Sequence, residues 1–160
     1  MRNKPLRQRQ LAAIGMVTVE WSFLESHVHL AFRELLDLSL ETGRGISGRI
    51  RRMDTLLAII RERGLLALRE DLRDRMDAVL IKIRSLEEER NHVTHAAWYA
   101  NEDWAGREPS YRGLMQGAFP SRHGWTEPLF LTSEDLKQLA ARISSTSTEL
   151  LTILLEHWQR

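Results

Sequence analysis

Apolar side chains recur at intervals of three and four residues along most of this chain, which is the period of an amphipathic helix. One such stripe runs over residues 14–38 and stops close to Gly43. A second runs over 46–60, with Gly64 as its expected C-cap, and a third over 65–86. Each stripe predicts one helix that packs through a single face.

A fourth helix is predicted to begin at the stretch "LTSEDL". Thr132 stands at the N-cap position there, and Asp135 follows at the third helical position, where a carboxylate completes a capping box. Leucines and isoleucines at helical spacing continue this stripe to Leu154.

Residues 98–131, between the third and fourth stripes, differ in composition. Glycines, prolines and aromatic residues alternate there, and breakers at this density exclude a long helix. We expect an irregular insertion that contains a loose hairpin between Tyr99 and residues 129–131. The predicted fold is therefore an all-α, up-and-down bundle of four to five helices with a hairpin or irregular insertion, formed by 1–160 as a single domain.

Composition narrows the class of protein. Hydrophobic residues make up 42% and charged residues 28% of the 160 positions, which is typical of a globular chain. The net charge of +1 is too balanced for nucleic-acid binding through bulk charge, so any such binding needs a local patch. No apolar run approaches the length of a membrane span, and the basic start "MRNKPLRQRQ" lacks the apolar core of a secretory signal. We expect a cytoplasmic protein that does not enter a membrane.

The stretch "RNHVTH" brings reactive side chains to the end of the third stripe. Arg90 occupies a position where the stripe requires an apolar residue, so its guanidinium needs an anion or a route to solvent. Asn91 and His95 are four residues apart and share a helical face. At roughly 100° per residue, His95 is turned about 140° from Arg90, with Asn91 between them.

These three side chains suit RNA cleavage without a metal. That reaction needs a base for the 2′-hydroxyl proton, an acid for the leaving oxygen, and positive charge beside the phosphorane. An imidazole serves as acid or base near neutral pH, and a guanidinium matches phosphate oxygens with its fork of donors. Because one chain offers one such histidine, two proton carriers require a two-fold dimer.

"RNHVTH" resembles the motif of the HEPN superfamily, in which Arg is followed by Asn, Asp or His and, after four to six intervening residues, by His. Arg90, Asn91 and His95 fill these places. The resemblance implies an all-α fold, with the motif late in a long helix, and a homodimer with a shared cleft. It also implies a metal-independent endoribonuclease of toxin–antitoxin or defence systems, with RNA as substrate, an antitoxin as a possible partner and no cofactor.

Two positions depart from that family. Ala97 stands where the branch paired with nucleotidyltransferase antitoxins carries a tyrosine, and Tyr99 lies two places later. Ala96 stands where many relatives have glycine, so we expect the helix to continue past His95.

Two other interpretations of the motif stay open. Arg90 could be purely structural and pair with Glu20 or Glu25 of the first helix. A metal site could use Glu89 with His92, but di-iron bundles need a second E-x-x-H pair on a facing helix, and the sequence holds none. We therefore assign no metal ligands.

Two further groups are weaker candidates for RNA contacts. The run "GRGISGRIRR" could follow a phosphate backbone, although such a run is more often a solvated helix start; its arginines are Arg44, Arg49, Arg51 and Arg52. Trp98 and Tyr99 could stack on unpaired bases, although aromatic residues in such a connector more often pack it.

Two functions follow from these patterns. The first is a HEPN-type endoribonuclease with Arg90, Asn91 and His95 as catalytic residues. The second is a catalytically silent, HEPN-like helical module that dimerises and binds a partner protein or RNA.

Overall fold

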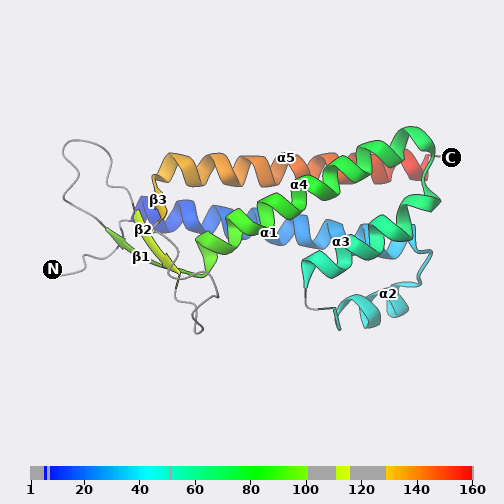
Figure 1. The fold of residues 1–160 in the computed structure, drawn as a ribbon, viewed down its shortest axis with the longest axis horizontal. Helices are drawn as coiled ribbons and strands as arrows, with labels where there is room; N and C mark the ends of the chain where they lie inside the picture. The colour runs from blue at the N-terminus through cyan, green and yellow to red at the C-terminus, as the bar shows by residue number, and fades with distance from the viewer. Residues whose placement is uncertain (1–5, 7, 51, 101–110, 116–128, 160) are drawn as a thin grey trace.

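A computed structural model describes residues 6, 8–50, 52–100, 111–115 and 129–159. Five α-helices account for most of them, as Figure 1 shows: α1 (Gln8–Leu35), α2 (Leu40–Ser47), α3 (Met53–Glu62), α4 (Glu70–Thr94) and α5 (Ser133–Trp158). A single 3₁₀ turn, η1 (Gly64–Ala67), precedes α4. Three short strands lie between α4 and α5 in the chain: β1 (Ala96–Ala100), β2 (Tyr111–Met115) and β3 (Leu129–Leu131). The predicted all-α bundle is confirmed.

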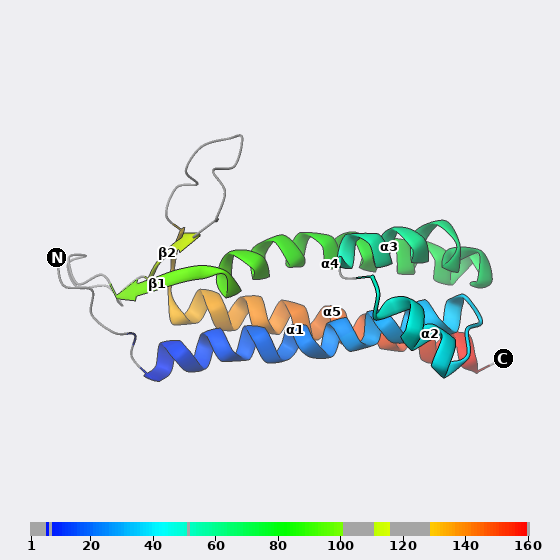
Figure 2. The same cartoon turned by 90° about the horizontal axis from the view of Figure 1, so that it is seen from below.

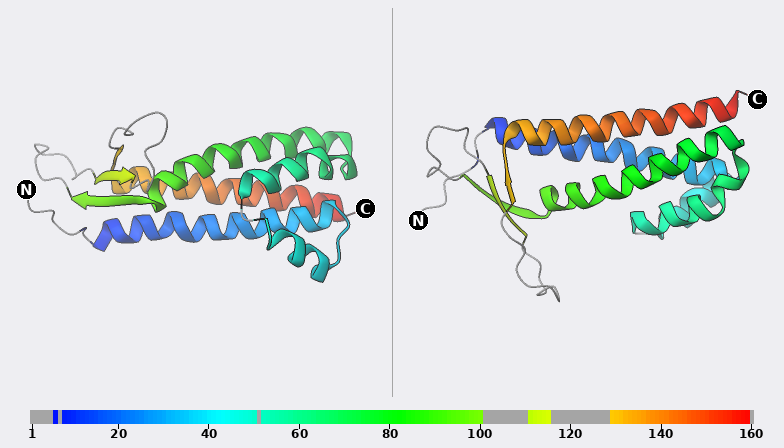
Figure 3. Two further views of the ribbon diagram at one scale, coloured as in Figure 1. Left: turned by 60° about the horizontal axis from the view of Figure 1, so that its bottom comes forward. Right: turned by 45° about the horizontal axis from the view of Figure 1, so that its top comes forward.

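The three long helices α1, α4 and α5 lie alongside one another, and α4 runs antiparallel to the other two (Figure 3). The small sheet lies at the end where α1 and α5 begin, and α2 and α3 lie toward the other end (Figure 2). Among the described helices, none is long and apolar enough to cross a membrane.

The predicted stripes form one continuous core. Each helix except α2 contributes fully buried large side chains, namely Leu24 and Phe32 from α1, Leu56 and Ile60 from α3, Leu72, Met76 and Ile83 from α4, and Leu136, Ile143 and Leu150 from α5. Burial of these side chains is the main force that holds the helices together.

Three ion pairs at heptad spacing set the register between α4 and α5. Arg75 binds Glu156 at 2.6 Å, Lys82 binds Glu149 at 2.8 Å, and Glu89 binds Arg142. Each step is seven residues forward on α4 and seven residues back on α5, as expected for antiparallel helices with a shared seam. Exposed pairs contribute little free energy individually. Their regular spacing shows which side of α4 faces α5.

The prediction of a single helix over residues 46–60 is wrong. Two helices occupy that region, because α2 ends at Gly48 and Arg52 adopts an extended backbone (φ −108°, ψ 123°) before α3 begins. The start of α2 was missed. Ser39 caps it by accepting a hydrogen bond from the Thr42 N–H at 3.2 Å. The next predicted helix also begins later, at Glu70, since residues 64–67 form η1.

The insertion contains a sheet rather than a two-stranded hairpin. Strand β2 lies in the middle and pairs antiparallel with both β1 and β3. The predicted pairing of Tyr99 with residues 129–131 is therefore wrong, because Tyr99 lies opposite Arg112. Strand propensity alone did not identify β2 within residues 98–131. Without β2, the order of the strands could not be predicted.

The capping box of α5 is confirmed. The Asp135 N–H donates to Thr132 Oγ1 at 3.1 Å, and the Thr132 N–H donates to Asp135 Oδ2 at 2.8 Å. Two backbone N–H groups that the first turn would leave unpaired are satisfied in this way.

Replacing the cap should cost measurable stability. We expect Thr132→Ala to lower the free energy of unfolding by about 1 kcal/mol, because the Asp135 N–H loses its acceptor. Thr148→Ala is the matched control, since Thr148 is exposed within the same helix and its hydroxyl donates to the Ser144 carbonyl of that helix. Chemical denaturation of both variants measures the difference. Equal stability of the two would contradict a stabilising role for the capping box.

Candidate functional site

The motif lies at the end of α4 beside the sheet. The helix ends at Thr94, and His95 is its C-cap, with a non-helical backbone (φ −103°, ψ 1°) and an N–H that donates to the Asn91 carbonyl at 3.1 Å. The expectation that the helix continues past His95 is wrong. The next five residues form β1, and each of them has its register partner in β2, from Met115 opposite Ala96 to Tyr111 opposite Ala100. Strand pairing therefore ends the helix without a glycine.

Arg90 packs between α4 and α1. Its guanidinium carbon lies 4.7 Å from the centroid of the Trp21 ring, which is the geometry of a cation–π contact. Trp21 itself is buried, with 2% of its surface exposed. Arg90 Nη1 also donates to Asn91 Oδ1 at 2.8 Å. The arginine at an apolar stripe position is therefore accommodated by an aromatic face and a neighbouring amide.

The Arg90 side chain is half-buried, and it lies among carboxylates. Burial lowers the pKa of its guanidinium, and the negative charges of Glu25 and Glu87 act in the opposite direction. An arginine stays protonated under these conditions. Its Nε is buried and has no hydrogen-bond partner among the described residues. One donor of the fork is thus held away from water without an acceptor, which costs free energy.

A charged cluster surrounds Glu87, because the charges of Glu25, Arg52, Asp54 and Arg90 all act on its carboxyl. It joins three elements, because Glu25 lies in α1, Arg52 and Asp54 lie at the start of α3, and Glu87 lies one turn before Arg90 in α4. Arg52 binds Asp54 through Nε at 3.1 Å. Burial raises the pKa of the Glu87 carboxyl, and the charge of Asp54 adds to this, against the opposing charges of Arg90 and Arg52.

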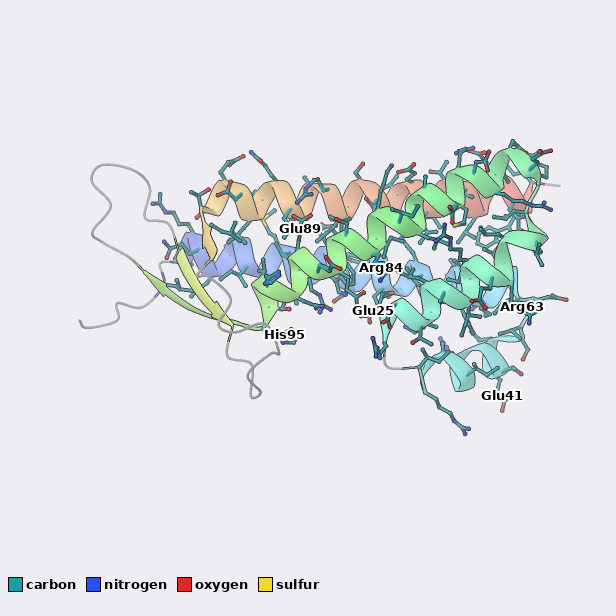
Figure 4. All side chains as sticks on the ribbon, in the orientation of Figure 1. Glu25, Glu41, Arg63, Arg84, Glu89 and His95 are labelled. Atoms are coloured by element: carbon teal, nitrogen blue, oxygen red, sulfur yellow. The ribbon has the colours of Figure 1, made fainter. Side chains whose placement is uncertain are left out.

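His95 and Asn91 present the open part of the site. His95 is exposed at the sheet end of α4 (Figure 4). Asn91 is half-buried. The side-chain oxygen of Asn91 accepts a hydrogen bond from Arg90, and its amide N–H groups remain as donors. The arrangement combines a held cation, a donor and an exposed imidazole within six residues.

Glu89, which the metal interpretation would use as a ligand, is already bound by another side chain. Both carboxylate oxygens of Glu89 are bound by Arg142. In the part of the chain that the structure describes, no group of three or more His, Asp or Glu side chains is arranged to hold a metal ion.

The weaker candidates for RNA contacts lie in different parts of the structure. Arg44 and Arg49 are exposed at α2, Arg52 reaches the charged cluster, and Arg51 lies outside the described residues. Trp98 and Tyr99 lie in β1, directly after His95, and their register partners are Gly113 and Arg112. Of the three arginines in this group that the structure describes, Arg52 is the one whose charge acts on Glu87, as that of Arg90 does.

Sequence reasoning missed three contributors to this site. Trp21 was assigned only to the core, and Asp54 and Glu87 were not assigned. Of the two carboxylates proposed as partners of Arg90, Glu25 is the one whose negative charge raises the pKa of the guanidinium. The helical period carried a signal for Glu87, because a residue three positions before Arg90 lies on nearly the same face.

Comparison of this chain with models of protein families, with curated proteins and with solved structures gave no match.

The raised pKa of Glu87 predicts a pH-dependent effect on stability. The folded state holds the Glu87 proton more tightly than the unfolded state, so the ionised carboxylate destabilises the fold above the ordinary carboxyl range. We expect Glu87→Gln to raise the free energy of unfolding at pH 7, by less than about 1 kcal/mol. The gain should disappear as the pH falls through the folded pKa toward the ordinary glutamate value, where the wild-type carboxyl also becomes neutral.

Thermal or urea unfolding at pH 7 and pH 4 measures this effect. Glu88→Gln is the control, because Glu88 is exposed on the same helix and its replacement should change stability by less than about 0.5 kcal/mol at both pH values. A Glu87→Gln variant that is less stable than wild type at pH 7 would mean that attraction to Arg52 and Arg90 outweighs burial.

Proposed function

We propose that the protein is a metal-independent endoribonuclease of the HEPN type that acts as a homodimer. The observation that carries the proposal is the pairing of a held cation with an exposed imidazole. Arg90 is fixed by Trp21 and Asn91, and His95 stands exposed at the end of the same helix. Cleavage of a phosphodiester by an internal nucleophile requires groups of these two kinds, a positive charge and a side chain that transfers protons.

The reaction needs two histidines, one from each copy. A neutral His95 takes the proton of the 2′-hydroxyl, and the 2′-oxygen forms a bond to phosphorus. The P–O5′ bond then breaks, and the imidazolium of the other His95 gives its proton to the departing oxygen. The products are a 2′,3′-cyclic phosphate and a 5′-hydroxyl end.

Arg90 stabilises the charge that develops on the non-bridging phosphate oxygens. Its fork is rigid and permanently charged, and its contact with Trp21 orients it before substrate arrives. Asn91 holds the guanidinium through Oδ1 and offers its amide N–H groups to a phosphate oxygen.

Arg52 and the exposed arginines of α2 provide positive charge for the RNA strand beyond the reacting phosphate. The resemblance of "RNHVTH" to the HEPN motif connects the chain with toxin–antitoxin or defence systems, in which an antitoxin protein would be a natural partner. Cytoplasmic location belongs to the same proposal.

A second candidate is a catalytically silent helical module. The observation that favours it is the burial of Arg90, since a guanidinium stacked on a core tryptophan also serves as a clamp between α1 and α4. In that function the motif stabilises the bundle and the protein acts by binding a partner protein or RNA.

Cleavage assays test the enzyme directly. RNA incubated with the wild type in excess EDTA should be cut to fragments with 2′,3′-cyclic phosphate ends. His95→Ala should lower the rate by about 10²- to 10⁴-fold, because it removes a proton carrier from both copies. His92→Ala is the matched control, as a histidine on the same turn turned away from Arg90, and should retain most of the activity. Equal cleavage by the wild type and His95→Ala would mean a contaminating nuclease.

Arg90 variants separate catalysis from clamping. Arg90→Met keeps an unbranched apolar stem over Trp21, so we expect the free energy of unfolding to stay within about 1 kcal/mol of wild type. Cleavage should fall by about 10²- to 10³-fold, because the stabilising charge is lost. Circular dichroism, urea unfolding and the EDTA assay are measured on the same preparation. Full cleavage by this variant would assign Arg90 to the clamp alone.

A further inference from the structure

Glu87 lies on the face of α4 that carries the motif. At roughly 100° per residue, Asn91 is turned about 40° and His95 about 80° from Glu87, and Arg90 lies about 60° away on the other side. Along the helix axis, Glu87 stands about 4.5 Å from Arg90 and about 12 Å from His95. A phosphate held between Arg90 and His95 is therefore about 8 Å from the level of Glu87, close enough for the two charges to interact.

The charged groups that act on Glu87 have a net negative charge when Glu87 is included. Glu25 acts from α1, and Arg52 and Asp54 act from the start of α3. With Glu87 and Arg90 from α4, the described part of the chain brings two positive and three negative charges together, which leaves a net charge of −1. An RNA phosphate that approaches Arg90 thus meets a cluster whose net charge has the same sign as its own.

Both arginines of the cluster are bound by partners other than Glu87. Arg52 donates to Asp54 from Nε at 3.1 Å. Arg90 donates to Asn91 Oδ1 at 2.8 Å. Burial and the charge of Asp54 raise the pKa of the half-buried Glu87 carboxyl, against the opposing charges of the two arginines. A proton on Glu87 removes this cost and brings the net charge of the cluster to zero.

Stability does not explain a carboxylate at this position. The ionised Glu87 side chain destabilises the fold at neutral pH, whereas the uncharged amide of a glutamine has the same shape and lacks this effect. Carboxyl groups with shifted pKa values are concentrated at functional sites, because binding and catalysis use their charge. The place of Glu87 beside the motif therefore points to a function of its charge at the site.

We propose that Glu87 controls RNA binding through its charge, so that an RNA phosphate at Arg90 and a proton on Glu87 favour each other's binding. The ionised carboxylate repels the phosphate, and the protonated carboxyl does not. This inference rests on the proposed function, because it takes an RNA phosphate as the anion at Arg90. By linkage, RNA binding takes up a proton, and the affinity for RNA rises as the pH falls from neutral toward the ordinary carboxyl range.

The size of the effect follows from the separation of the two charges. Like charges about 8 Å apart weaken a binding constant about 2-fold at the dielectric constant of water, and about 30-fold at an effective value of about 20. Salt at about 0.1 M screens part of this repulsion, because its Debye length is about 10 Å. We therefore expect the charge of Glu87 to weaken RNA binding by about 3- to 10-fold.

Binding of a labelled single-stranded RNA at pH 7.5 and pH 5.0 tests the proposal. All proteins in this experiment carry His95→Ala, which prevents cleavage and removes the titration of that imidazole. Adding Glu87→Gln should tighten binding about 3- to 10-fold at pH 7.5 and less at pH 5.0, where part of the Glu87 carboxyl is already protonated. Adding Glu88→Gln is the matched control, because Glu88 is exposed and turned roughly 100° from Glu87. It should change the affinity by less than about 2-fold.

Calorimetry measures the proton directly. Titration of the His95→Ala protein with the same RNA at pH 6.0, in two buffers with different heats of ionisation, gives the number of protons taken up. The protein with Glu87→Gln should take up fewer protons, by a fraction of one, and the protein with Glu88→Gln should match its parent. In the protein that retains His95, Glu87→Gln should lower KM at pH 7.5 by about 3- to 10-fold and change kcat less.

The outcomes distinguish this inference from the ribonuclease activity. Equal RNA affinity with Glu87→Gln and with Glu88→Gln at pH 7.5 overturns the control by Glu87, whether or not the wild type cleaves RNA. Absence of RNA binding at both pH values overturns it as well. Weaker binding with Glu87→Gln, at unchanged helix content, would mean that Glu87 supports Arg90 instead of repelling RNA. Tighter binding with Glu87→Gln alone, without cleavage by the wild type, supports the control and overturns the proposed activity.

Discussion

The contact between Arg90 and Trp21 is the constraint on which the site depends. An arginine in the seam between two helices needs either an anion or a polarisable surface, and α1 supplies the face of an indole at 4.7 Å. The contact ties the end of α4 to the middle of α1 and leaves the guanidinium only half-buried. The same interaction that closes the bundle therefore also keeps a permanent cation close to solvent.

The rotation of α4 about its own axis decides what the rest of the motif faces. Arg75, Lys82 and Glu89 all point toward α5, and each is paired there. Because that side of α4 packs against α5, Arg90, which follows Glu89, points toward α1. His95 is exposed at the end of the helix. Strand β1 then removes the chain from the helix directly after His95. Packing, ion pairing and strand pairing together fix the positions of three adjacent functional groups.

The sequence predicted the features that depend on local period and local chemistry. The long stripes, the Thr132–Asp135 cap and the unusual position of Arg90 all follow from spacing along one helix. The features that it missed depend on contacts between distant segments. The break at Arg52 and the central position of β2 are examples, because neither glycine spacing nor strand propensity encodes which neighbour a segment meets. Trp21 was missed as part of the site for the same reason, since its stripe position is equally consistent with ordinary core packing.

Helix α1 combines two surfaces that would conflict in an isolated domain. One side buries Trp21 and Leu24 and carries the platform for Arg90, and the opposite side exposes Met16, Val19 and Phe23. A helix selected only to cover a core would place charged residues on the second side, because they improve solubility at little cost in stability. Instead its hydroxyls bond their own backbone and its charges are nearly absent. Helix α1 thus supports a cation on one side and presents an apolar surface on the other.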